Sequence, residues 1–107
     1  MNRRKRLHKN PSGKLKSVFL RGRKWFDPNG NTYHSVQIKV NGSEVGYVPF
    51  EYGYGEQWVY TGVKALMELG YIPKKKDFIA WKVLDALSEK GVHVDYYAHD
   101  VKRKKDL

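Results

Sequence analysis

The chain has 107 residues, a length that suits one domain with a single hydrophobic core and is too short for two. It contains no cysteine, which excludes disulfide bonds, thiolate nucleophiles and cysteine-based zinc sites. No stretch approaches the roughly 18 apolar residues of a membrane span, and the basic N-terminus is not followed by the apolar run of a signal peptide, so we expect a cytoplasmic protein without membrane contact.

The formal net charge of +10 is concentrated at the two ends of the chain. Residues 1–24 carry ten lysines and arginines and no acidic residue, and residues 74–107 carry nine basic and six acidic residues. Residues 25–73 carry only two basic and five acidic residues. Because a localised excess of positive charge indicates an anionic partner, we expect the ends of the chain to make that contact.

The N-terminal half of the chain predicts a basic arm followed by strands. Residues 1–16 combine charges with the turn-forming residues of segment 10–13, which is typical of a flexible arm. Aromatic and branched residues from Ser17 to Phe26 predict a strand, in which Gly22 suggests a bulge. The turn formers of segment 27–31 predict a hairpin connection to an alternating strand.

That second strand extends from Thr32 to Val40, and the turn signal Asn41-Gly42 leads into a third strand, which ends at Pro49 or lies at an edge of the sheet. After a glycine and tyrosine loop, helical spacing from Trp58 to Leu69 predicts a helix that ends at Gly70.

A second helix is predicted after the three lysines of segment 74–76, with Asp77 as its N-cap and Gly91 at its end. Alternation from Val92 to Asp100 predicts a fourth strand. The order β-β-β-α-α-β predicts an α+β domain over residues 17–100, with a small antiparallel sheet and both helices packed on one face. Residues 101–107 form a basic C-terminal tail.

Nucleic acid is the anionic partner that this charge distribution favours most. Lysines and arginines neutralise phosphates and release counterions, which gives sequence-tolerant binding to DNA or RNA. The alternative is a tail that only keeps the protein soluble. The candidate nucleic-acid-binding residues are Arg3, Arg4, Lys5, Arg6, Arg21, Arg23, Lys24, Lys74, Lys75, Lys76, Lys102, Arg103, Lys104 and Lys105.

Nine aromatic residues are crowded between positions 25 and 60. On an exposed sheet such rings can stack on unpaired bases, whereas a chain with few leucines and isoleucines is also expected to use them in its core. We expect most of the nine to be buried, and we take Tyr52, Tyr54 and Trp25 as the candidate contacts. Exposed tyrosines beside glycines also suit a contact with another protein.

Two further patterns are candidate chemical sites. His93, Asp95 and His99 share one face of the last predicted strand, with His34 as a fourth candidate, and a metal ion held there could activate water for phosphodiester hydrolysis. A solvent-exposed strand face also carries such residues without any metal. Segment 53–55 precedes a helix, but its glycine spacing is neither that of a Walker A loop nor that of a dinucleotide-binding loop. It is expected to form a tight turn. No signature of catalysis is present, so we expect neither an enzyme nor a cofactor.

Two segments, Gly-Asn-Thr-Tyr-His-Ser at 30–35 and Pro-Phe-Glu-Tyr-Gly-Tyr-Gly-Glu-Gln at 49–57, resemble a family of small uncharacterised proteins encoded by tailed bacteriophages, and the resemblance covers residues 22–72. It implies a phage origin and a site of action in the cytoplasm of an infected bacterial host, and it carries over no catalytic residue. The order of three strands and a helix is also similar to double-stranded-RNA-binding domains. Here, however, no helix precedes the strands, and the following helix begins with Glu56-Gln57 instead of a lysine cluster.

Three functions remain open from the sequence. The first is a non-catalytic accessory protein that binds nucleic acid through its basic arms and an aromatic surface. The second is an effector that binds and inhibits a host defence or metabolic protein through the Tyr52–Tyr54 loop. The third is a metal-dependent nuclease, and a homodimer through an edge strand is compatible with each.

Overall fold

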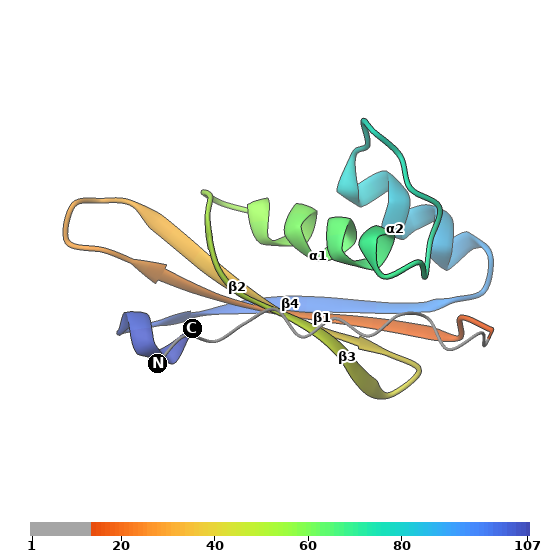
Figure 1. The fold of residues 1–107 in the computed structure, drawn as a ribbon, viewed down its shortest axis with the longest axis horizontal. Helices are drawn as coiled ribbons and strands as arrows, with labels where there is room; N and C mark the ends of the chain where they lie inside the picture. The colour runs from red at the N-terminus through yellow and green to blue at the C-terminus, as the bar shows by residue number, and fades with distance from the viewer. Residues whose placement is uncertain (1–13) are drawn as a thin grey trace.

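The computed structural model describes residues 14–107, and in it two helices pack on one face of a four-stranded sheet (Figure 1). Neither helix in this range is long and apolar enough to cross a membrane. The predicted α+β class, the order of the elements and the placement of both helices on one face are confirmed. The elements are β1 (Ser17–Phe26), β2 (Thr32–Val40), β3 (Ser43–Tyr52), α1 (Gln57–Glu68), α2 (Ala80–Glu89), β4 (His93–Val101) and a 3-10 turn, η1 (Lys104–Asp106).

The sheet is mixed, with the strand order β3-β2-β1-β4. Two hairpins make β1, β2 and β3 antiparallel, as predicted, and β3 lies at an edge, where its Pro49 is tolerated. The fourth strand differs from the prediction, because β4 pairs parallel to β1, with Ser17 beside His93. The two helices return the chain to the end of the sheet where β1 begins, so β4 runs in the same direction as β1 (Figure 1).

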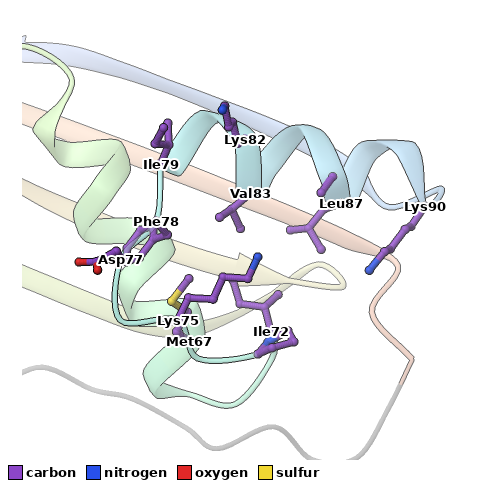
Figure 2. Close-up of a pocket in the computed structure, with 12 residues that line it drawn as sticks. Met67, Ile72, Lys75, Asp77, Phe78, Ile79, Lys82, Val83, Leu87 and Lys90 are labelled. Carbon is purple, nitrogen blue, oxygen red and sulfur yellow. The ribbon is translucent and has the colours of Figure 1, made fainter.

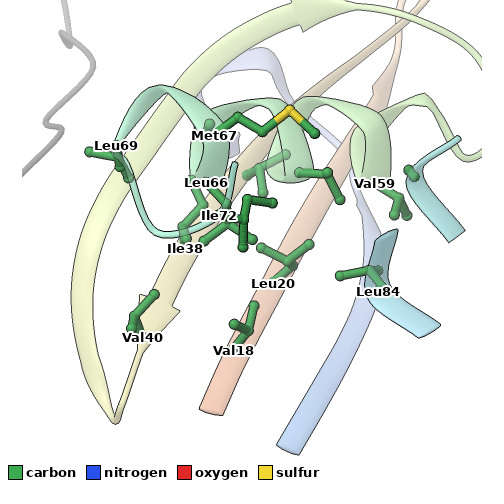
Figure 3. Packing of buried hydrophobic residues seen from close by; sticks show 14 of the residues in the cluster. Val18, Leu20, Ile38, Val40, Val59, Leu66, Met67, Leu69, Ile72 and Leu84 are labelled. Carbon is green, nitrogen blue, oxygen red and sulfur yellow. The ribbon is translucent and has the colours of Figure 1, made fainter. Parts of the chain in front are cut away.

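The core between the sheet and the helices is mainly aliphatic (Figure 3). Leu20 of β1, Ile38 of β2 and Leu66 of α1 are each 0% exposed. The expectation of an aromatic core was wrong, because Tyr47 and Trp58 are the only buried members of the nine-residue aromatic set. Valines at alternating strand positions supply the apolar volume instead, which leaves most of the rings outside the core.

Gly22 lies in a regular part of β1, without the bulge that its position suggested. The ring of Trp58 packs directly over it, so a Cβ atom at residue 22 would lie 2.6 Å from Trp58 Cε3. The irregular register occurs between β2 and β3 instead, at His34/Val36 and at Ile38/Lys39. Glycine at position 22 is therefore required by the close approach of α1 to the sheet.

The boundaries of the second helix also differ from the prediction. It begins at Ala80 and not after Asp77, because Ile79 keeps extended backbone angles at φ −106° and ψ 116°. Among residues 14–107, no side chain caps this helix. Gly91 ends it as predicted, with φ 90°.

The last residues of the chain, 102–107, cross the sheet face that the helices leave uncovered, and we call this segment the C-terminal strap (Figure 1). It starts at the end of β4, at one edge of the sheet, and reaches β3 at the other edge. The Tyr47 hydroxyl of β3 donates a 2.7 Å hydrogen bond to the carbonyl oxygen of Leu107, and the Leu107 side chain is buried. The basic tail therefore lies against the sheet.

The start of the described chain is also held in place. Asn41 Oδ1 accepts hydrogen bonds from the backbone N–H groups of Lys16 and Ser17, and Asn41 Nδ2 donates to the carbonyl oxygen of Lys14. The remainder of the predicted basic arm, residues 1–13, lies outside the described residues.

Candidate nucleic-acid interface

One face of the sheet is left uncovered by α1 and α2 and is crossed only by the C-terminal strap among the described residues, and we call it the open face. Successive strand residues point to opposite faces, so the helices cover Val18, Leu20 and Gly22, whereas Arg21 and Arg23 point to the open face. Residues paired directly across neighbouring strands point to the same face. Ser35 of β2 and His99 of β4, which flank Arg23, therefore also point to the open face.

Five aromatic residues, Trp25, Tyr33, Phe50, Tyr52 and Tyr54, form a connected series on the open face, which we call the aromatic ladder. Its centre is Tyr33, whose ring centroid lies 4.6 Å from that of Phe50 and 5.8 Å from that of Trp25, both in stacked geometry. Tyr52 contacts Tyr33 edge-on at 5.5 Å. Direct cross-strand pairing of Trp25 with Tyr33, and of Tyr33 with Tyr52, brings these rings together.

The outer members of the aromatic ladder are accessible to solvent. Phe50 is 40% exposed, Tyr52 54% and Tyr54 59%. Trp25 and Tyr33 are half-buried beneath them. The ladder therefore presents exposed rings that are held in position by partly buried ones.

Tyr52 and Tyr54 are joined to each other at the edge of the sheet. The Tyr52 hydroxyl donates a 2.7 Å hydrogen bond to the Tyr54 hydroxyl, and the rings meet edge to face at 5.5 Å. This hydrogen bond is the main cause that raises the pKa of Tyr52. Tyr52 therefore stays uncharged at neutral pH and would not repel a phosphate.

Positive charge lies on the same face as the ladder. The Lys104 ammonium of the C-terminal strap is 4.9 Å from the ring centroid of Phe50. Arg21 and Arg23 precede Trp25 on β1 at alternate positions. Arg21 Nε is buried and finds no hydrogen-bond acceptor among the described residues.

Lys24 does not join this group, although it is next to Arg23 in the sequence. It points to the opposite face of the sheet, where its Nζ donates a 3.2 Å hydrogen bond to the carbonyl oxygen of Gly55 and lies 3.9 Å from Glu56 Oε1. Arg21, Arg23 and Lys24, which are neighbours in the sequence and were all predicted to bind nucleic acid, are therefore divided between the two faces.

The other predicted basic residues are distributed as follows. Lys74, Lys75 and Lys76 lie in the loop between α1 and α2, on the helix side of the sheet, and so do not join the ladder. In the strap, Arg103 makes hydrogen bonds of 3.1 and 3.2 Å to the Asp106 carboxylate, whereas Lys102 and Lys105 are exposed. Arg3, Arg4, Lys5 and Arg6 lie outside the described residues.

Tyr33 and Phe50 were not singled out as contact residues from the sequence, although they form the centre of the ladder. The two hairpin signals and the alternation of β2 contained part of the information needed to pair them. The irregular register between β2 and β3 had no such signal, and this irregularity lies between their positions.

The predicted metal candidates lie on one strand. His93, Asp95 and His99 alternate on the open face of β4, but within residues 14–107 no three histidine or carboxylate side chains come together in a way that could hold a metal ion. His34 cannot be a fourth member, because it points to the helix face and is 1% exposed.

His34 contacts α1 instead of a metal site. Its Nε2 lies 2.7 Å from Thr61 Oγ1 of α1, and Thr61 in turn donates a 3.3 Å hydrogen bond to the Gln57 carbonyl oxygen. Burial, and secondly the nearby Lys24 charge, lower the pKa of His34 to about 4, while the Gly53 backbone opposes this shift. His34 is therefore a neutral ring that links β2 to α1.

No protein-family model, curated protein or solved structure matches the chain. The feature of the described structure that points to a function is the set of exposed stacked rings beside cations, on the sheet face that α1 and α2 leave uncovered.

Proposed function

We propose that the protein binds single-stranded nucleic acid on its open face, without catalysis. Bases stack on the aromatic ladder, and phosphates pair with Arg21, Arg23 and Lys104. The observation that carries this function is the stacked series of Trp25, Tyr33 and Phe50 beside the Lys104 ammonium.

The exposed rings suit unpaired bases because every base has a flat aromatic surface. Base–aromatic stacking is worth roughly 1–3 kcal/mol per base, and the bases of a duplex are not free to make it. Stacking also depends little on which base is present, so we expect binding that tolerates many sequences in DNA or RNA.

The cations supply the electrostatic part of binding. Lys104 is carried to Phe50 by the C-terminal strap, so the basic tail and the ladder belong to one surface. The basic residues of segment 1–13 add further positive charge, which can attract the phosphates of a single-stranded nucleic acid. The resemblance of residues 22–72 to phage proteins makes the cytoplasm of an infected bacterium the place where we propose that this binding occurs.

The test is fluorescence anisotropy with short labelled single strands of DNA and RNA, and with a duplex of the same sequence. We expect Phe50→Ala and Tyr52→Ala each to raise the Kd by at least about fivefold, as the loss of one stacked base implies. Trp81→Ala is the matched control, because Trp81 is a partly exposed ring on α2 that packs on Tyr96 on the helix side of the sheet, away from the ladder. Absence of binding at low salt, or equal effects of all three variants, would show that this function is wrong.

A second candidate is a protein contact at the edge of the sheet, as expected for an effector that inhibits a host protein. The exposed Tyr52 and Tyr54 rings at the end of edge strand β3 favour it, because exposed tyrosines are common at interfaces and edge strands can pair with another chain.

Affinity capture from host lysate after nuclease treatment separates the two candidates. A partner that stays bound without nucleic acid, and that Tyr52→Ala with Tyr54→Ala releases, supports the effector. A partner that is lost on nuclease treatment supports nucleic-acid binding.

A further inference from the structure

A groove with a volume of about 570 Å³ lies on the helix side of the protein, between α2, the end of α1 and the loop that joins them (Figure 2). Its apolar lining includes Met67, Ile72, Phe78, Val83 and Leu87. The groove is separate from the open face, because the sheet lies between them (Figure 1).

The groove exists because α2 has apolar residues on more than its core face. Ala80, Leu84 and Leu87 are buried, whereas Ile79 and Val83 lie one turn apart and face the groove. Ile79 is 55% exposed. Within residues 14–107 no other element covers this apolar surface.

Basic side chains outnumber acidic ones around the groove. Lys75, Lys82 and Lys90 line it together with one acidic residue, Asp77. Figure 2 shows Lys75 extending from the loop toward α2 and Lys90 directed toward the groove, whereas Lys82 points away from it. No ion pair is formed by the Lys75 or Lys90 side chain with any described residue.

We propose that this groove binds a small carboxylate with an apolar chain, of the fatty-acid class. The apolar chain lies along Ile72, Phe78 and Val83, where it leaves water, and the carboxylate pairs with Lys75 and Lys90. The volume and the mainly apolar lining with a few charged groups are those of a small-molecule site. Asp77 lies away from the two lysine ammoniums in Figure 2, so its charge favours this orientation of the ligand over the reverse.

The probe is decanoate, kept below the concentration at which it forms micelles and titrated into the ¹⁵N-labelled full chain. We expect saturable shifts of backbone amide signals at Ile72, Val83 and Leu87. Decyltrimethylammonium is the matched probe, with the same chain and the opposite charge, and should bind at least about tenfold more weakly. Shifts that are absent from the groove, or that are equal for the two probes, would overturn the assignment and leave the groove to another occupant, such as an acidic protein segment.

Substitutions of the lysines test where the carboxylate of decanoate binds. Lys75→Glu with Lys90→Glu should weaken decanoate binding by at least about tenfold, because two attractive charges become repulsive. Lys64→Glu is the control, since Lys64 is an exposed lysine of α1 outside the groove, and it should leave binding nearly unchanged. Equal losses in both variants, with folded spectra, would contradict the proposed role of the two lysines. Phe50→Ala should not alter decanoate binding, so the groove and the open face are tested separately.

Discussion

Tyr33 and Phe50 stack with their ring centroids 4.6 Å apart and their planes at 16° to each other. They belong to neighbouring strands, so the contact links the centre of the open face to its edge. Tyr33 is half-buried and Phe50 is 40% exposed, which makes Tyr33 the support and Phe50 the accessible surface.

Replacing Tyr33 should therefore weaken binding of the nucleic acid even where the Tyr33 ring itself does not touch a base. We expect Tyr33→Ala to raise the Kd for a single strand by at least about fivefold, because it frees both Phe50 and Trp25 from their stacked positions. Tyr33→Phe keeps the ring and should bind nearly as the unaltered protein does. Fluorescence anisotropy measures both variants, and equal losses would indicate a role for the Tyr33 hydroxyl instead of the ring.

The salt dependence of binding should show whether the two arginines of β1 contact phosphates. For single strands the slope of log K against log salt is about −0.7 for each phosphate contact, so Arg21→Gln with Arg23→Gln should make the slope less steep by about 1.4. Lys64→Gln with Lys82→Gln removes the same charge from the helix side and should change the slope much less. A similar change in both pairs would mean that net charge, and not the open face, determines the salt dependence.

Gly22 should not tolerate even the smallest side chain. A Cβ atom there would lie 2.6 Å from Trp58 Cε3, so Gly22→Ala forces α1 away from the sheet and should lower the free energy of unfolding by about 1–3 kcal/mol. Chemical denaturation measures this loss. In a Trp58→Ala background the ring that this Cβ would meet is absent, so the same substitution should cost less, and equal costs in the two backgrounds would place the strain elsewhere.

His34 should make stability depend on pH. Its pKa is lowered from 6.5 to about 4 in the folded protein, so the unfolded chain binds a proton more readily between these values. Its stabilising contribution is complete above about pH 6.5 and is lost as the pH falls toward 4. The full difference is on the order of 3 kcal/mol.

Denaturation midpoints across this range measure the effect of His34. His34→Gln should flatten the pH dependence, because glutamine does not titrate there. His99→Gln, which removes an exposed histidine on β4, should retain it. If both variants keep the dependence, another group is responsible.

The local features of the fold were accessible from the sequence, and the long-range ones were not. Asn41 and Gly42 adopt the positive φ angles of 51° and 86° that their hairpin signal implied. The parallel pairing of β4 with β1 had no such local signal, because it joins nearly opposite ends of the domain. The start of α2 differs from the prediction because Asp77 is a residue type that favours a helix N-cap, whereas in the structure Ile79 is extended and the helix begins at Ala80.

The candidate site shows the same division. Alternation along β1 would have separated Lys24 from Arg21 and Arg23, but their closeness in the sequence suggested one cluster. The contact of Lys104 with Phe50 depends on the path of the C-terminal strap across the sheet, which neither charge nor hydropathy of the strap predicted.

The position of β4 has a consequence for how the chain folds. The meander of β1, β2 and β3 consists of local hairpins that can form early, whereas β1 acquires its second neighbour only when the last strand has been synthesised and has docked. Until then the backbone groups along one side of β1 are unpaired and offer a template for strands of other chains. Premature termination before β4 is therefore expected to yield an aggregation-prone product, and completion of the sheet is the step that protects the nascent protein.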